Sequence, residues 1–146
     1  MGKDFEMINA VFSTLVEREK QRGAEGINDI ERVVLLVWHA SGIIGNGGFR
    51  YFFECGLSLP ETAKAYERIG VENVVSVFHQ VRELFPANEI PDNWDERMVL
   101  VEGLYEGQAE LLEQLESEFF SADELMEQQL AGWIRVNKDV FQPTNV

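Results

Sequence analysis

Residues 28–56 read NDIERVVLLVWHASGIIGNGGFRYFFECG, and this stretch decides the fold. Residues 33–38 are all apolar, and a helix that is apolar on every side is a buried one. Asn28 and Glu31 have the spacing of a capping box, which marks the start of this helix. We therefore expect a buried central helix over about 29–41.

Further helices are predicted on both sides, because apolar residues recur there at three- and four-residue steps. The predicted helices span residues 4–22, 46–54, 61–69, 72–85 and 94–119, a last helix contains residues 125–134, and residues 137–146 form a tail. Ser58 and Ser121 are the expected caps of the helices that follow them. No strand pattern or linker interrupts the series. The fold class is therefore all-α, a single-domain bundle of about seven helices over 1–146.

Charge limits the partners that this chain can bind. The 146 residues carry 26 acidic and 12 basic side chains, for a net charge of −14. Residues 83–146 hold 15 of the acids and only 3 of the bases, so the excess lies in an acidic helical half, 83–136. Nucleic acid and anionic membranes would both repel this charge. We expect no direct contact with either, and a basic partner instead.

Compartment signals in the sequence are few. The single cysteine, Cys55, excludes an internal disulfide. The N-terminal residues lack the apolar core of a signal peptide, and no apolar run approaches the ~20 residues of a membrane span. A cytoplasmic protein is the expectation.

One segment carries a family resemblance. Residues 45–53 read GNGGFRYFF, and the helix predicted over 61–69 ends in Ile69-Gly70. This combination resembles the signature of the DNA-mimic-protein family, whose members are small all-α bacterial proteins. The signature positions here are Asn46, Gly47, Gly48, Phe49, Tyr51, Phe52 and Gly70, within a family-like core of about 30–85. The resemblance implies a helical fold, and that at least some relatives use an acidic surface in place of DNA phosphates to occupy DNA-binding proteins.

The predicted helix 94–119 carries a stripe of glutamates at steps of four, four and three residues. Four residues of helix rise about 6 Å, which is close to the spacing of phosphates along a nucleic acid strand. A row of carboxylates at this step suits a phosphate mimic. The predicted partner-binding residues are Glu102, Glu106, Glu110, Glu113, Glu116, Asp123, Glu124 and Glu127. The alternative interpretation is a solvated helix face without a partner.

Other chemistry has weaker support. The glycine-rich turn could bind an anion at a helix N-terminus, or could be structural, with Asn46 as a helix cap. The structural interpretation is favoured because the phosphate-binding glycine motifs are absent. Cys55 and His39 have no spacing that indicates a nucleophile pair, and no cluster of metal ligands is present, so neither a metal nor another cofactor is expected. The three tryptophans are predicted to lie in the core.

The first functional hypothesis is a non-enzymatic acidic binding protein that occupies the basic surface of a DNA-binding protein such as a transcriptional regulator. An immunity-type inhibitor of a basic nuclease toxin would need the same surface. From a different class, an enzyme could use a cleft near Asn46, Cys55 and His39, and a deep pocket there would favour it. A structural homodimer would be indicated by an exposed apolar patch.

Overall fold

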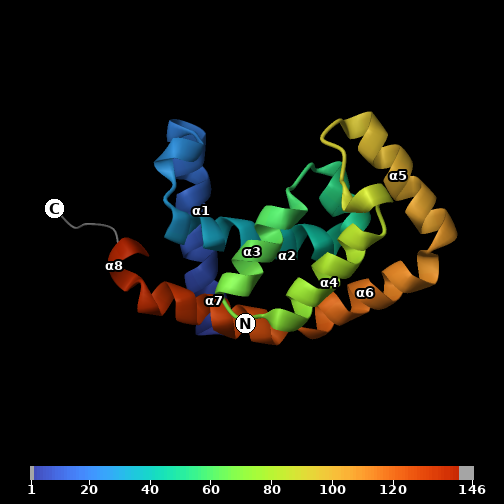
Figure 1. Cartoon of the computed structure of the whole chain (residues 1–146). Helices are drawn as coiled ribbons and strands as arrows, with labels where there is room; N and C mark the ends of the chain where they lie inside the picture. The colour runs from blue at the N-terminus through green and yellow to red at the C-terminus, as the bar shows by residue number, and fades with distance from the viewer. Residues whose placement is uncertain (1, 142–146) are drawn as a thin grey trace.

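The computed structural model describes residues 2–141, which form eight α-helices, two short 3-10 turns and no strand (Figure 1). The elements are α1 (Lys3–Arg22), η1 (Ala24–Gly26), α2 (Asp29–Glu54), α3 (Leu59–Arg68), α4 (Glu72–Glu83), η2 (Pro86–Asn88), α5 (Trp94–Gly107), α6 (Ala109–Ser121), α7 (Asp123–Val136) and α8 (Lys138–Phe141). The predicted all-α class is confirmed. None of these helices combines the length and apolar character that a membrane crossing requires.

The start of α2 is the capping box expected from the sequence. Asn28 Oδ1 accepts a hydrogen bond from the Glu31 N–H at 2.8 Å, and Glu31 Oε1 accepts one from the Asn28 N–H at 3.1 Å. Val34 and Val37 are fully buried, so the central position of this helix is also confirmed.

The predicted end of this helix near Ser41 was wrong. The helix continues through Gly42 and Gly45, and Ile44 between them is fully buried. Burial of the apolar face therefore outweighs the ~1 kcal/mol that each glycine costs a helix. The two helices predicted for 29–54 are one helix with a break.

The break in α2 lies at Gly47 and Gly48. Their φ and ψ angles are −149° and 16°, and 67° and −167°, and both pairs are non-helical. The angles of Gly48 lie in a region that is open almost only to glycine. The helix then resumes at Phe49, which is fully buried.

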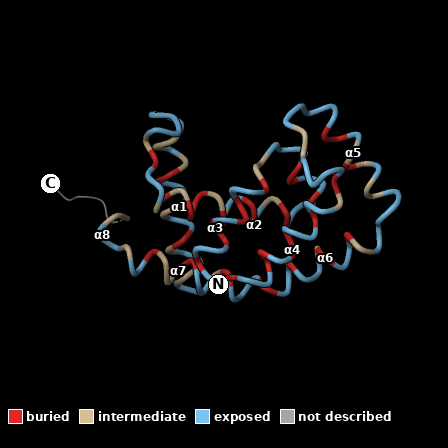
Figure 2. Tube along the Cα trace, viewed as in Figure 1, coloured by how far each residue is buried: buried red, intermediate tan, exposed pale blue. Residues whose placement is uncertain are grey.

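Five aromatic rings form the centre of the core. They are Phe49 and Phe52 of α2, Tyr66 of α3, Phe78 of α4 and Phe119 of α6. Phe78 has ring neighbours in the three other helices, with centroids 5.2 to 6.4 Å apart. In Figure 2 the buried residues gather where these helices meet. The segment after the break thus joins α2 to the other core helices.

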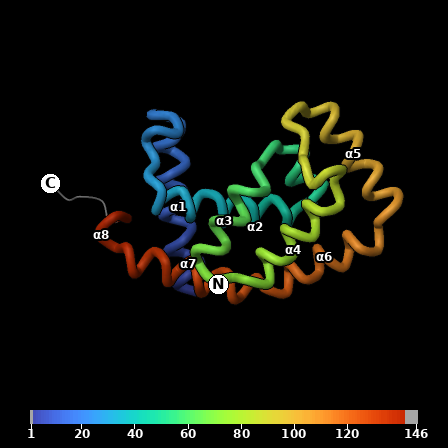
Figure 3. Tube along the Cα trace, in the orientation of Figure 1, coloured from blue at the N-terminus to red at the C-terminus, as the bar shows by residue number. Residues whose placement is uncertain are grey.

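The second half of the chain forms an arc around this core. Figure 3 shows α5, α6, α7 and α8 following one another along its rim. We call α5–α7, residues 94–136, the acidic arm. The prediction of one helix over 94–119 was wrong, because Gln108, with φ −128° and ψ 30°, separates α5 from α6. Gly103 and Gly107 lower the helix propensity of the segment before this break.

Of the two serines predicted to cap helices, Ser58 does so and Ser121 does not. Ser58 Oγ accepts the Glu61 N–H at 3.3 Å, which confirms this cap, although α3 begins at Leu59. Ser121 is not a cap, because its hydroxyl donates to the Glu118 carbonyl at 2.7 Å. The expected tail from 137 also contains α8 (Lys138–Phe141), and residues 142–146 lie outside the described part.

Candidate functional site

The acidic arm is attached to α2 at the glycine break. The Phe49 N–H and the Tyr105 O–H both donate to Glu116 Oε2, at 2.9 and 2.7 Å, and the Arg50 N–H donates to Tyr105 Oη at 3.0 Å. The first N–H groups of a helical segment have no acceptor within it. Glu116 and Tyr105 supply these acceptors, so the prediction that Asn46 caps this segment was wrong.

This geometry explains the two glycines of the signature. A Cβ atom on Gly48 would lie 2.2 Å from Glu116 Oε2, and one on Gly47 would lie 2.5 Å from Tyr51 Cβ. Gly48 therefore lets a carboxylate from the arm reach the backbone of α2, whereas Gly47 makes room for Tyr51 of the same helix. The anion held by this turn is the side chain of Glu116 itself.

The other signature positions are divided between the core and the surface. Phe49 and Phe52 are core residues, whereas Asn46 and Tyr51 are exposed. Gly70, with φ 80°, follows the last turn of α3. The structural interpretation of the signature is thus the one that the geometry supports.

Tyr105 is held in its neutral form at this junction. Burial, the hydrogen bond to Glu116 and the negative charge of Glu116, in that order, raise the pKa of Tyr105 well above its usual value. The phenol therefore stays a donor to Glu116 at neutral pH. Glu116, which the sequence placed among the partner-binding residues, is committed to holding the arm against the core.

Glu102 is neutralised by a neighbour. Its Oε1 lies 2.6 Å from Arg50 Nη2, and both side chains are about half exposed. Among residues 2–141, Glu102 is the only acidic residue of the arm with a basic group within 4.0 Å. The other carboxylates of the arm have no such ion pair within the described residues, although Glu116 is hydrogen-bonded at the α2 junction.

The outer face of α6 gathers three of these carboxylates. Glu110, Glu113 and Glu118 are exposed and line an open, shallow depression together with Gln114, Ser117 and Ser121. The opposite side of α6 buries Leu112, Leu115 and Phe119. In Figure 2 the outer rim of α5 and α6 is coloured as exposed. We call Glu110, Glu113 and Glu118 the α6 triad.

The remaining predicted residues lie on either side of the triad. Glu106 is exposed near the end of α5, before the break at Gln108. On α7, Asp123 and Glu124 are exposed and Glu127 is half-buried. The row predicted on one helix, from Glu102 to Glu113, is therefore divided between α5 and α6, and the α7 residues lie on the following helix, as expected. Glu118, eight residues and about 80° around the same helix from Glu110, was not among the predicted partner-binding residues.

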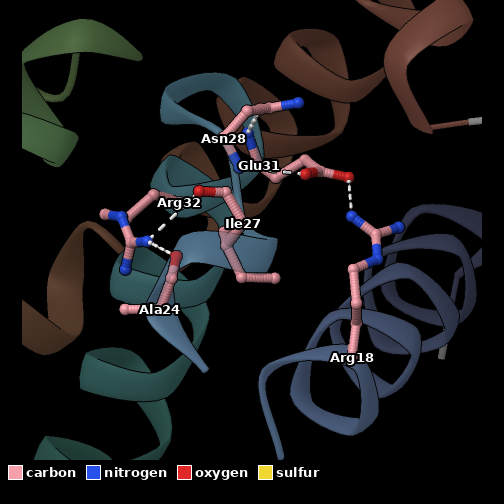
Figure 4. Close-up of polar contacts among 6 residues, drawn as sticks. All are labelled: Arg18, Ala24, Ile27, Asn28, Glu31 and Arg32. Carbon is pink, nitrogen blue, oxygen red and sulfur yellow. Dashed lines mark hydrogen bonds and ion pairs between the residues drawn. The ribbon is translucent and has the colours of Figure 1, made fainter. Parts of the chain in front are cut away.

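A second polar cluster lies at the opposite end of α2 (Figure 4). The carboxylate of Glu31, which is only 3% exposed, forms an ion pair with Arg18 of α1. Arg32 Nη2 donates to the carbonyl groups of Ala24 and Ile27, at 2.8 and 3.3 Å. These contacts fix the connection between α1 and α2, and a cavity of about 580 Å³ lies beside them.

The residues of the enzyme hypothesis do not converge. His39 and Asn46 are seven residues apart on α2, which corresponds to ~10 Å along the axis. Cys55 is exposed at the far end of this helix. Within residues 2–141, no three His, Cys, Asp or Glu side chains are placed to hold a metal ion. Of the tryptophans, Trp94 is half exposed, so its predicted core position was wrong.

Comparison with known families adds to this geometry. The model of the DMP19-like protein family matches residues 25–137. The chain belongs to this family. The match contains the whole of α2 and the acidic arm, so it extends well beyond the core of about 30–85 on which the resemblance was based. No curated protein and no solved structure gives a significant match.

Proposed function

We propose that this chain is a non-enzymatic DNA mimic. In this proposal, the α6 triad replaces DNA phosphates and occupies the basic surface of a DNA-binding protein such as a transcriptional regulator. Glu106 and Glu124 extend the same charge along the arm. Glu102 and Glu116 contribute less to the binding surface, because Arg50 neutralises the first and the α2 break holds the second.

The observation that carries the proposal is the exposure of the triad without basic partners. Glu110 and Glu113 are one helical turn apart, and like charges at this spacing destabilise a helix by a few tenths of a kcal/mol. No base of the described residues relieves this repulsion. A basic partner surface would relieve it, and the unbalanced field of the arm would also speed the encounter. Membership in the DMP19-like protein family supports the same role.

The experiment compares three baits in a bacterial lysate at low salt. The first is the native chain, and the second carries Glu110→Gln, Glu113→Gln and Glu118→Gln. The third is a matched control with Glu67→Gln, Glu72→Gln and Glu83→Gln, which removes the same charge from exposed positions on α3 and α4.

We expect the native and control baits to retain a DNA-binding protein that the triad variant loses. Capture of a nuclease in the same pattern would favour the immunity-type inhibitor, which uses the same surface. If the triad and control variants lose the same proteins equally, net charge alone explains the binding. The assignment to α6 would then be wrong.

A further inference from the structure

Helix α1 packs against both α2 and α7. Residues of these three helices line a small pocket. Its volume is about 260 Å³, several times the ~30 Å³ that one water molecule takes up in the liquid. Phe5 of α1, Trp38 of α2 and Met126 of α7 supply its apolar surface. Asp123 and Glu127 of α7 supply two carboxylates. The pocket therefore combines an aromatic wall with negative charge.

The aromatic wall is held in place by its own contacts. The Trp38 ring meets Phe5 edge-on, with centroids 5.5 Å apart and an angle of 64° between the planes. The Trp38 indole N–H donates to Asn9 Oδ1 at 3.0 Å, so the polar end of the ring already has a partner. Trp38 thus offers an oriented apolar surface and needs no hydrogen bond from a ligand.

The two carboxylates are free to receive a cation. Asp123 and Glu127 are four residues apart on α7 and so are neighbours on one side of the helix. Neither has a basic group within 4.0 Å among residues 2–141. Asp123 accepts only a long hydrogen bond, 3.4 Å, from the Ser41 hydroxyl.

We propose that this pocket binds the guanidinium group of one arginine side chain from the basic partner. The proposal rests on the proposed function and identifies what the partner must present. A guanidinium stacks on an indole, and its planar set of donors can serve two carboxylates at once. A lysine ammonium suits the pocket less well, because it is more strongly hydrated and has no flat face.

The pocket and the α6 triad would then have separate tasks. Exposed carboxylates attract a basic surface over a distance but discriminate poorly among basic proteins. A pocket that accepts one arginine sets the register, and arginine is among the residues that contribute most to binding at interfaces. The pocket would thus select partners among the proteins that the arm attracts.

The test is an NMR titration of the ¹⁵N-labelled chain with N-acetyl-L-arginine amide, a probe with one guanidinium and no other charge. The indole N–H of Trp38 is the reporter, and those of Trp94 and Trp133 are internal controls. N-acetyl-L-citrulline amide is the uncharged probe of the same shape. We expect a saturable shift of the Trp38 signal with the arginine probe, and none with the citrulline probe.

Gly42 allows the pocket to be closed without removing any charge. It lines the pocket, and a Cβ atom there meets nothing within 4 Å, so the side chain of Gly42→Leu starts in open space beside the pocket. Gly45→Leu is the matched control, since Gly45 has equal space on the same helix and does not line the pocket. We expect Gly42→Leu, and separately Asp123→Asn with Glu127→Gln, to weaken the arginine probe at least tenfold. Gly45→Leu should bind as the native chain does.

The inference is overturned if the Trp38 signal does not saturate, if citrulline binds as well, or if Gly42→Leu binds as Gly45→Leu does. The triad variant separates this result from the proposed function, because its pocket is unchanged. If that variant loses the partner and the native pocket does not bind the arginine probe, only this inference fails. If the pocket binds the probe and capture is independent of the triad, the proposed function fails and the arginine site stands.

Discussion

Glu116 of α6 accepts the main-chain N–H of Phe49 on α2 at 2.9 Å, so the acidic arm caps the helix around which the core is built. The same oxygen accepts the Tyr105 hydroxyl at 2.7 Å. A carboxylate that the sequence places in an acidic surface therefore has a structural task. The contact also fixes α6 relative to α2, and so fixes the direction in which the α6 triad faces.

Replacing Glu116 with alanine should destabilise the fold. The Phe49 N–H and the Tyr105 hydroxyl would both lose their acceptor, and an unsatisfied buried polar group costs about 1–3 kcal/mol. We expect the free energy of unfolding in urea to fall by this amount. Glu113→Ala, which removes an exposed carboxylate from the same helix, should change it by less than ~0.5 kcal/mol. Equal effects of the two changes would show that the cap contributes nothing.

Replacing Gly48 with alanine should lower the stability of the fold, whereas replacing Gly45 with alanine should raise it. Gly48→Ala places a Cβ atom 2.2 Å from Glu116 Oε2 at a φ of 67°, and the backbone strain alone costs about 1–3 kcal/mol. Gly45 lies within the helix with open space, so Gly45→Ala should stabilise the fold by ~1 kcal/mol. Urea unfolding of both variants measures the difference. A Gly48→Ala variant as stable as the native chain would contradict the close approach of the arm.

Alkaline pH should weaken the fold partly through Tyr105. Burial and the contact with Glu116 raise the pKa of Tyr105, while the unfolded chain loses this proton near its usual pKa of about 10. The folded state therefore binds more protons above pH ~10, and stability falls as pH rises through that range. Burial first, and Asp123 second, raise the pKa of Tyr66 in the same direction.

Tyr105→Phe isolates the contribution of this junction. The variant loses two hydrogen bonds, so it should be less stable than the native chain at pH 8. Its stability should then fall less steeply than that of the native chain between pH 9 and 11, because Tyr66 is then the only tyrosine left with a strongly raised pKa. Urea unfolding midpoints of the two proteins at several pH values give the pH dependence of each. Parallel curves would mean that Tyr105 ionises as easily in the folded chain as in the unfolded one.

Replacing Glu31 should destabilise the fold more than replacing an exposed glutamate nearby. Its carboxylate accepts the Asn28 N–H and pairs with Arg18, and the residue is 3% exposed. Glu31→Ala removes both contacts, and a lost cap together with a lost partly buried ion pair should cost about 2 kcal/mol or more. Glu25→Ala, an exposed change in the nearby connection, should stay within ~0.5 kcal/mol in the same thermal or urea assay. A loss as small as that of Glu25→Ala would assign no stabilising role to this cluster.

Local signals in the sequence were sufficient for most helix starts. The capping box of Asn28 and Glu31, and the cap at Ser58, each depend on residues only three positions apart. Helix continuity was less predictable, because it depends on packing. Gly42 and Gly45 stay helical around the buried Ile44, whereas the chain leaves the helix at Gln108.

The contact between the acidic arm and α2 could not be predicted from the spacing of residues in the sequence. Glu116 and Phe49 are 67 residues apart, and no local pattern relates a glutamate of one helix to a free N–H of another. For the same reason the sequence could not separate Glu116, which is bonded, from Glu113, which is free. The salt bridge between Arg50 and Glu102 is equally long-range. Only the excess of carboxylates in the second half of the chain was evident from composition.

The measurement that tests the account most directly is a competition titration with the captured partner. The affinity of the partner for the native chain would be measured at a fixed salt concentration and at increasing concentrations of duplex DNA that the partner binds. A mimic and DNA compete for one surface, so the apparent Kd should rise in proportion to the DNA concentration without reaching a limit. An apparent Kd that stays constant or levels off at saturating DNA would show that both bind at once, and would contradict the claim that the α6 triad takes the place of DNA phosphates.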